Sequence, residues 1–309
     1  MQKREIIVVA GPTAVGKTKY AIEAALACNG EVVSCDSMQL YKYMDIGSAK
    51  PTPEEQARVK HYLVDQIDPA EAFSVAEYQK LAKEAIEEIF ARGKTPVIAG
   101  GTGLYLNSLL YEMDFGAAPQ DSALRDQLEE EAEKYGPEYI HNKLKEADPV
   151  AAGRIHPNNV KKVVRALEGA LSGSPIADFS NVQQKCGDYE AVLIGLTRDR
   201  AELYDRINLR VELLVEQGLF DEVEGLLRRG LTESDISMKG IGYKEIIGYF
   251  HGQYGREEAI DLIKKNTRHL AKRQLTWFRR YEDMQWLDIS RFSSDEEAIE
   301  EMIIWLKNR

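Results

Sequence analysis

The sequence has few cysteines and no long apolar run, and both shortages narrow the kind of protein that it encodes. No apolar stretch approaches the roughly 18 residues that a membrane-spanning helix needs, which favours a soluble protein. Cys28, Cys35 and Cys186 are odd in number and lack metal-ligand spacing, which is typical of buried thiols in a reducing compartment. Residues 1–5 lead straight into a short apolar run without a signal-peptide pattern, so we expect a cytoplasmic protein.

The chain also has fewer basic than acidic residues. Its net charge of −11 argues, taken alone, against a polyanionic partner. Binding to nucleic acid depends, however, on where the cations lie, and here they are segregated. Residues 261–281 carry seven Lys or Arg and a single acid, whereas residues 126–133 and 295–301 are strongly acidic. One local surface can therefore still attract phosphates.

A glycine-rich loop is the strongest motif that is present. Residues 11–18 match the pattern G-x-x-x-x-G-K-[ST] between an apolar run at 6–10 and a helical pattern from residue 20. Two glycines let successive N–H groups point inward, and the following helix adds the positive end of its dipole. Lys17 supplies a point charge and Thr18 a hydroxyl suited to Mg²⁺. A turn without ligand is the alternative, but the strand–loop–helix context argues against it; by default such a loop is a nucleotide (ATP) site.

Polar groups follow two further expected strands. Asp36 comes directly after the apolar residues 31–35, and Gly100-Gly101-Thr102-Gly103 follows residues 94–99. Ligands of open parallel sheets sit at the carboxyl ends of strands, so Asp36 is a candidate for chemistry, with a helix N-cap as an equal alternative. No acid follows the strand that ends at residue 99, which counts against simple NTP hydrolysis.

The pattern along the chain predicts an α/β protein: a P-loop NTPase-like parallel sheet flanked by helices, with an all-helical insertion. Further strands are expected at 61–64, 189–196 and 285–288, and a helix at 74–91. Residues 113–186 show helical patterns, the last at 157–171, and turn residues bracket them at Gly116 and at residues 173–175. The expected domains are therefore a core of residues 1–112 and 187–309 and an insertion of residues 113–186.

Two later helices carry cations in patterns that leave alternatives open. Arg206 and Arg210 share one face of a helix expected at 199–217, where they could clamp a phosphate. Spacing alone favours surface pairing with Glu202, Asp205 or Glu212 instead. A helix over residues 261–281 has Ile263, Leu270, Trp277, Phe278 and Tyr281 on one side and its Lys and Arg residues on the other. Such a basic stripe can face phosphates, a membrane, a partner helix or only solvent.

Seven stretches, in order, resemble one family over nearly the whole chain: the bacterial tRNA dimethylallyltransferases, or tRNA isopentenyltransferases. They are GPTAVGKT at 11–18, DSMQLYKYMDIGSAKP at 36–51, AGGTGLYL at 99–106, HPNNVKKVVRALE at 156–168, YDRINLRV at 204–211, IGYKE at 241–245 and TRHLAKRQLTWFRR at 267–280. The resemblance implies transfer of a dimethylallyl group from dimethylallyl diphosphate to the exocyclic N6 amine of the adenine 3′ of the tRNA anticodon, with release of diphosphate.

The resemblance also implies residue roles. Asp36 would accept the proton of the amine, Thr102 would hydrogen-bond the bridging oxygen, Arg206 would clamp the diphosphate, and Thr18 would hold Mg²⁺. The diphosphate would lie on Gly11, Pro12, Thr13, Ala14, Val15, Gly16, Lys17 and Thr18. The implied tRNA path comprises Asp36, Ser37, Met38, Gln39, Thr102, Arg125, Lys161, Lys162, Val163, Val164, Arg165, Lys239, Gly240, Ile241, Gly242, Tyr243, Lys244, Lys272, Arg273, Gln274, Trp277 and Arg279. The helical insertion would close over the anticodon loop, and the enzyme would be a monomer.

Three other functions fit parts of the sequence. A P-loop kinase could use Asp36 as base for a hydroxyl with ATP as donor. An adenylate isopentenyltransferase would share the core but use a free nucleotide as acceptor. A nucleotide-gated tRNA-binding protein would do no chemistry. The basic stripe and the insertion favour a macromolecular acceptor, and Asp36 with Thr102 argues against a binder alone.

Overall fold

The computed structural model describes residues 4–113, 122–173 and 184–308, which form two compact units. One unit comprises Met1–Leu110 and Cys186–Arg309, and the other comprises Tyr111–Lys185. The sequence placed these boundaries at residues 112/113 and 186/187. Of the turn residues expected to bracket the insertion, Gly116 and residues 174–175 lie outside the described ranges. No helix of the described ranges is long and apolar enough to cross a membrane.

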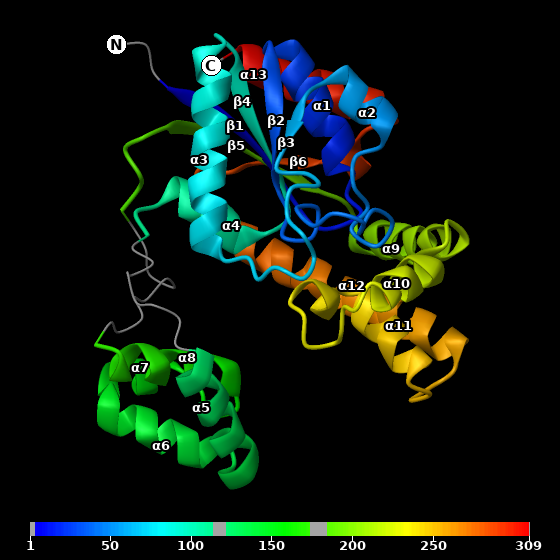
Figure 1. The fold of residues 1–309 in the computed structure, drawn as a ribbon. Coiled ribbons are helices and arrows are strands. Elements are labelled where there is room, and N and C mark those ends of the chain that lie inside the picture. The colour runs from blue at the N-terminus through cyan, green and yellow to red at the C-terminus, as the bar shows by residue number, and fades with distance from the viewer. Residues whose placement is uncertain (1–3, 114–121, 174–183, 309) are drawn as a thin grey trace. The chain divides into compact units, whose positions relative to one another are not determined.

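A six-stranded, all-parallel sheet forms the centre of the larger unit (Figure 1). Its spatial order is β3-β2-β4-β1-β5-β6. The strands are β1 (Glu5–Ala10), β2 (Gly30–Cys35), β3 (His61–Tyr62), β4 (Thr95–Gly100), β5 (Glu190–Thr197) and β6 (Gln285–Asp288). The strands predicted from apolar runs are confirmed. Gly100 pairs in register with both Ala10 and Cys35, so the carboxyl ends of β1, β2 and β4 lie level.

Helices cover both faces of this sheet, as a buried parallel sheet requires. Alternate residues of β1, Ile7 and Val9, share a core with α1 (Lys17–Ala27) and α13 (Asp295–Lys307). On the other face lie α3 (Val75–Ala91) and α4 (Gly103–Leu110), where the rings of Tyr78 and Tyr105 stack with centroids 4.0 Å apart (Figure 1). The remaining elements of this unit are α2 (Pro53–Arg58), α9 (Arg200–Glu216), α10 (Leu219–Arg228), η1 (Ser237–Lys239), α11 (Tyr243–Phe250), α12 (Arg256–Phe278) and η2 (Ile289–Arg291).

The smaller unit is a bundle of four helices in its described part, with a core of its own. These are α5 (Ser122–Tyr135), α6 (Pro137–Ala147), α7 (Pro149–Arg154) and α8 (Val160–Leu171). Leu128, Ile140, Leu144 and Leu167 are buried together in its centre. Helix α7 was not expected from the sequence; the Asp148 carboxylate caps it by accepting from Ala151 N at 2.9 Å. The last helix also begins at Val160 rather than at residue 157.

Candidate active site at the ends of strands β1, β2 and β4

The loop between β1 and α1 has a backbone that requires glycine at two positions. Gly16 has a φ of 110°, and a Cβ at Gly11 would lie 2.7 Å from the carbonyl oxygen of Leu196. Helix α1 begins at Lys17, so its free N–H groups and positive dipole end border the loop. The Nζ of Lys17 folds back and donates to the carbonyl of Pro12 at 2.9 Å. The loop therefore offers backbone donors and one ammonium group to an anion.

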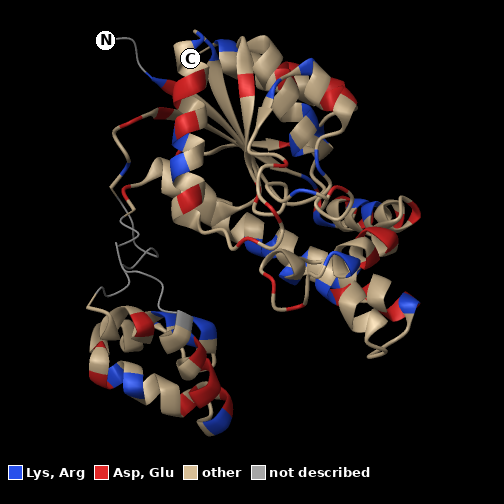
Figure 2. Ribbon diagram, in the orientation of Figure 1, with Lys and Arg blue, Asp and Glu red and all other residues tan. Residues whose placement is uncertain are grey.

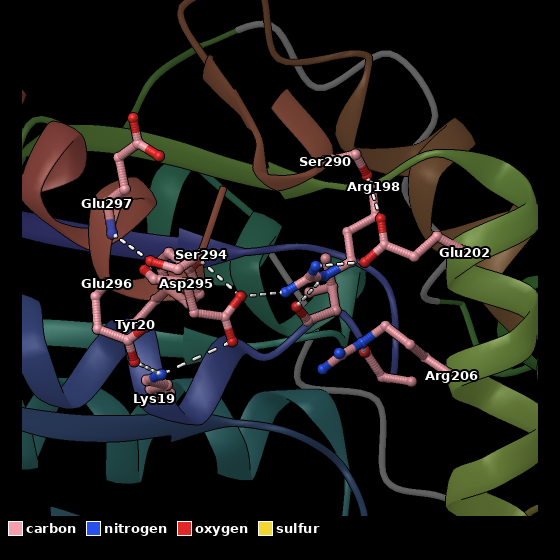
Figure 3. Close-up of polar contacts among 12 residues, drawn as sticks. Lys19, Tyr20, Arg198, Glu202, Arg206, Ser290, Ser294, Asp295, Glu296 and Glu297 are labelled. Carbon is pink, nitrogen blue, oxygen red and sulfur yellow. Dashed lines mark hydrogen bonds and ion pairs between the residues drawn. The ribbon is translucent and has the colours of Figure 1, made fainter. Parts of the chain in front are cut away.

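Two arginines hold the outer carbonyls of this loop. Arg206 Nε donates to Ala14 O at 3.1 Å, and Arg198 Nε donates to Val15 O at 3.3 Å. Arg198 is itself fixed between Glu202 and Asp295, at 2.5 Å from each carboxylate, and only 6% of its side chain is exposed (Figure 3). Buried charges are tolerated when they are paired in this way. The loop is thus anchored to α9 and to the start of α13.

Arg206 and Arg210 do not form the ion pairs that their spacing favoured. Within the described ranges no ion pair joins either guanidinium to an acid: Arg206, although exposed, donates to the loop carbonyl of Ala14, and Arg210 is partly buried. Burial lowers the pKa of Arg210, while the nearby Asp36 carboxylate opposes that shift and Arg206 adds to it. The helix-surface pairing with Glu202, Asp205 or Glu212 is therefore wrong.

Lys17 lies in the same electrostatic environment. Burial lowers the pKa of its ammonium group to about 8; Asp36 opposes the shift, and Arg210 contributes to it. Two cations, Lys17 and Arg210, thus lie near the Asp36 carboxylate, and Arg206 lies near Arg210. Such an excess of positive charge in a partly desolvated place suits a ligand that carries several negative charges.

Asp36 and Thr102 come together although they are far apart in the sequence. Ser37 N donates to Thr102 Oγ1 at 3.1 Å, and Thr102 N donates to Cys35 O at 3.1 Å. One carboxylate oxygen of Asp36 accepts from Met38 N at 2.9 Å, so the capping role that the sequence left open is also present. A carboxylate and a hydroxyl therefore stand side by side at the ends of β2 and β4.

A small cavity joins Asp36 to the glycine-rich loop of residues 11–18, called the phosphate loop below. Its volume is about 30 Å³, and Lys17, Thr18, Ser34, Asp36 and Gln39 are among the residues that line it. The loop lysine, the loop hydroxyl and the Asp36 carboxylate thus face one space. The Asp36 carboxylate can accept a proton, and the loop of residues 11–18 can bind an anion. Together they could serve a group transfer in which a phosphate or diphosphate leaves.

Helix α12 carries fewer available cations than the sequence predicted. It spans Arg256–Phe278 rather than residues 261–281, and Figure 2 marks its Lys and Arg positions in blue on the ribbon. Lys264 binds Glu212 at 2.8 Å and Arg268 donates to Asn208 Oδ1 at 2.5 Å, so both face α9. Apart from Arg256 in its first turn, the exposed Lys and Arg residues of this helix and its end are Lys265, Lys272, Arg273, Arg279 and Arg280. We call these five the basic stripe below.

Three residues expected along a tRNA path have side chains that RNA cannot reach. Val163 and Val164 are buried in the core of the helical unit, and Tyr243 is fully buried with its hydroxyl donating to Glu222 at 2.8 Å. The expectation covered continuous stretches, whereas a helix presents only some of its residues to solvent. Among their neighbours, Lys161, Lys162, Arg165, Lys239 and Lys244 are exposed.

Arg125 lies on α5 of the helical unit and binds a buried acid. Its guanidinium forms a bidentate pair with the Glu168 carboxylate, at 2.9 and 3.1 Å, and 29% of its side chain remains exposed. Arg165 donates to the same carboxylate at 2.9 Å. Arg125 therefore links α5 to α8 while part of its surface stays in water, whereas Arg165 pairs within α8.

Sequence reasoning missed Arg198, Asp295 and Glu222. The Glu222 carboxylate accepts from three successive backbone N–H groups at Asp45, Ile46 and Gly47, at 2.7, 2.7 and 2.9 Å. It thereby fixes the segment that follows Asp36. The sequence offers one weak signal for Arg198, which follows an expected strand directly; Asp295 and Glu222 lie in ordinary acidic helix patterns.

Comparisons with known proteins agree on one family. The chain matches the family model for IPP transferase over residues 39–281. It is similar to the tRNA dimethylallyltransferase of Alkaliphilus oremlandii (52% identity over 299 residues, 96% of each chain) and to that of Clostridioides difficile (48% over 308 residues, 100% of this chain and 99% of the relative).

Two solved structures have the same fold. The tRNA isopentenylpyrophosphate transferase of Bacillus halodurans superposes with a TM-score of 0.74 at 44% identity, covering 99% of this chain and 96% of that one. A eukaryotic dimethylallyltransferase acting on tRNA gives 0.81 at 28% identity, covering 99% of this chain and 80% of that one.

Proposed function

The chain belongs to the IPP transferase family, the tRNA dimethylallyltransferases, and we propose how its site performs the transfer. The donor is dimethylallyl diphosphate, and the acceptor is the N6 amine of the adenine 3′ of the tRNA anticodon. The observation that carries this proposal is the pairing of a phosphate loop with Asp36 and Thr102. A phosphate cradle thus borders a base and a hydroxyl, with no need for nucleotide hydrolysis.

Departure of the diphosphate is assisted by the cations around the loop. The bond between the allylic C1 and the bridging oxygen breaks, and its electron pair leaves with the diphosphate. Lys17, Arg206 and the backbone N–H groups of residues 11–18 stabilise that developing charge. Thr102 donates its hydroxyl proton to the bridging oxygen in a hydrogen bond, so the leaving group is held at both ends.

Asp36 acts as the general base of the reaction. The adenine N6 attacks C1, and its proton moves to the Asp36 carboxylate as the N–C bond forms. An aromatic amine is a weak nucleophile, so removing that proton contributes typically 10²–10⁴-fold. The hydrogen bond from Met38 N to Asp36 leaves the carboxylate oriented for this task.

The donor set of the loop fits Mg²⁺ held mainly through the substrate. No group of three His, Cys, Asp or Glu side chains could hold a metal in the described part of the chain. Mg²⁺ is commonly bound by one or two protein oxygens together with phosphates and water, and the Thr18 hydroxyl beside the loop supplies such an oxygen. When bound, the ion would spread the negative charge of the leaving diphosphate.

The acceptor base must leave its stack to reach Asp36. Flipping it out costs a few kcal/mol, which contacts to the anticodon loop must offset. We propose that the basic stripe meets the tRNA backbone, and that Arg125, Lys161, Lys162 and Arg165 of the helical unit contact the anticodon loop. Lys239 and Lys244 of the larger unit are also exposed, and we include them in the surface that contacts tRNA. The enzyme would work as a monomer.

Replacing Asp36 tests the base directly. We expect Asp36→Asn to lower the single-turnover transfer rate by about 10²–10⁴-fold, since the amide cannot take the proton. The affinity for dimethylallyl diphosphate, measured by calorimetry, should stay within a factor of about three, since the loop cations are intact. A matched control is Asp68→Asn, which removes a carboxylate from an exposed turn outside the site. An unimpaired single-turnover rate in Asp36→Asn would exclude Asp36 as the base.

A competition assay separates this function from its rivals. The protein is incubated with labelled dimethylallyl diphosphate and unmodified tRNA, with AMP as competing acceptor and ATP as competing donor. Label in tRNA alone supports the proposal. Label in AMP would show an adenylate isopentenyltransferase, phosphate transfer from ATP would show a kinase, and tRNA binding without either product would show a binder.

A further inference from the structure

The side-chain amide of Gln274 joins the two glycine-rich loops of the site. Gln274 lies on α12, and its Oε1 accepts from Thr13 N in the phosphate loop at 2.8 Å. Its Nε2 donates to the carbonyl of Gly101, one residue before Thr102, at 3.0 Å. One amide thus spans two segments of the chain that lie far apart in the sequence.

Helix α12 presses against the second glycine-rich loop at two successive turns. A Cβ at Gly101 would collide with Gln274 Nε2, and a Cβ at Gly103 would collide with the ring of Trp277. Residues 274 and 277 are three apart and therefore share a face of the helix. The close approach explains why both loop positions are glycine, and it leaves the Gln274 amide little freedom to move.

These contacts give Gln274, expected only as one residue along the tRNA path, a role inside the protein as well. Both polar atoms of the amide are already used by protein backbone, and the side chain is only partly exposed. Lys272 and Arg273, its neighbours on the helix, are exposed and carry the charge that RNA would meet. Gln274 therefore points inward while its neighbours point outward.

We propose that Gln274 is a positioning residue that sets the separation between the phosphate loop and Thr102. This inference rests on the proposed function, in which the loop holds the leaving diphosphate and Thr102 hydrogen-bonds its bridging oxygen. The bond that breaks lies between those two groups, so their separation must match one substrate geometry. A misplacement of about 1 Å can cost about 10²-fold in rate.

The test compares three substitutions at one position. Gln274→Met keeps the length but removes both hydrogen bonds. Gln274→Glu keeps an acceptor for Thr13 N but places a carboxylate against the Gly101 carbonyl. Gln274→Asn is a milder change that keeps the amide but shortens its reach. Glu257→Met is the matched control on the same helix, since its side chain is exposed and lies outside the basic stripe.

We expect Gln274→Met and Gln274→Glu to lower the single-turnover rate by about 10- to 100-fold, with Gln274→Asn falling between them and the unchanged protein. The Kd for tRNA should change less than twofold in all three. Glu257→Met should leave both the single-turnover rate and the Kd for tRNA nearly unchanged. Hydrogen–deuterium exchange in the peptide covering residues 11–18 should rise in Gln274→Met, because Thr13 N loses its acceptor.

Two results would overturn the inference. One is an unchanged single-turnover rate in all three Gln274 variants. The other is a rise in the Kd for tRNA of more than about fivefold, which would make Gln274 a direct RNA contact. If Gln274→Met fails to fold, as judged by its thermal unfolding, Gln274→Asn carries the same comparison. Failure of the proposed function is distinct, because the unchanged protein would then transfer no dimethylallyl group to tRNA.

Discussion

Individual side chains at this site are arranged to receive negative charge. Lys17 and Arg210 lie near Asp36, and Arg206 lies near Arg210. Burial lowers the pKa of Lys17 to about 8 and also lowers the pKa of Arg210. Like charges that are held together and partly desolvated are costly until an anion arrives. A bound diphosphate would remove the repulsion between these cations. The removal of that repulsion would contribute to the binding affinity.

This arrangement makes the binding of dimethylallyl diphosphate sensitive to pH. Lys17 loses its proton in the free enzyme as the pH rises through about 8, whereas the ligand favours the charged form. The affinity should therefore be nearly constant below pH 7.5 and then fall by up to about tenfold per pH unit. Calorimetry between pH 7 and 9.5 measures this. Lys17→Arg should keep a flat profile because its guanidinium stays charged, and a flat profile in the unchanged protein would contradict the prediction.

At the scale of elements, α12 serves two surfaces at once. One side contacts the active-site loops through Gln274 and Trp277 and pairs with α9 through Lys264 and Arg268. The other carries the basic stripe, including Lys272 and Arg273. The same helix therefore connects the surface proposed for tRNA with the loops proposed for the donor.

The salt dependence of tRNA binding tests the exposed side of this helix. Neutralising Lys272 and Arg273 together, each to Gln, should lower the slope of log K against log salt by about one for each phosphate that the variant no longer neutralises. The control neutralises Lys80 on α3 and Lys307 on α13, which are also exposed. Equal slopes for the two double variants would show that the stripe does not meet the RNA backbone.

At the scale of the whole molecule, the chain folds as two units that each bury their own core. The larger has a sheet with helices on both faces, and the smaller packs four helices around residues such as Leu144. Because the phosphate loop, Asp36, Thr102 and Gln274 all belong to the larger unit, donor binding should not depend on the smaller one. Acceptance of tRNA should depend on both units.

A core substitution in the smaller unit separates these two roles. Leu144→Ala should destabilise that unit by about 2–5 kcal/mol, because the side chain is fully buried. Hydrogen exchange of residues 122–173 should rise, the Kd for dimethylallyl diphosphate should stay unchanged, and tRNA transfer should fall. Leu171→Ala, on the exposed side of α8, makes the same chemical change and should leave all three nearly unaltered. A weaker affinity for the donor in Leu144→Ala would show that the units are coupled.

Local features of the sequence predicted most of the fold. The loop at residues 11–18, the strands from apolar runs and the helix expected at 74–91 depend on residues close together in the chain, so periodicity and spacing reveal them. The short helix α7 was not predicted, because the residue pair Asp148-Pro149 is typical of a turn when the packing of the segment is unknown. Helix ends shifted by a few residues for the same reason.

The sequence by itself therefore determined the glycine-rich loop at residues 11–18 and the succession of strands and helices along the chain. Its seven matching stretches also determined the family. Only the tertiary structure decided which side chains face the site. Gln274 meets Thr13 across 261 residues of chain, Arg198 meets Asp295 across 97, and Tyr243 turns into the core instead of toward RNA. A side chain's partner depends on how elements pack against each other, and that packing is a property of the whole fold rather than of any local pattern.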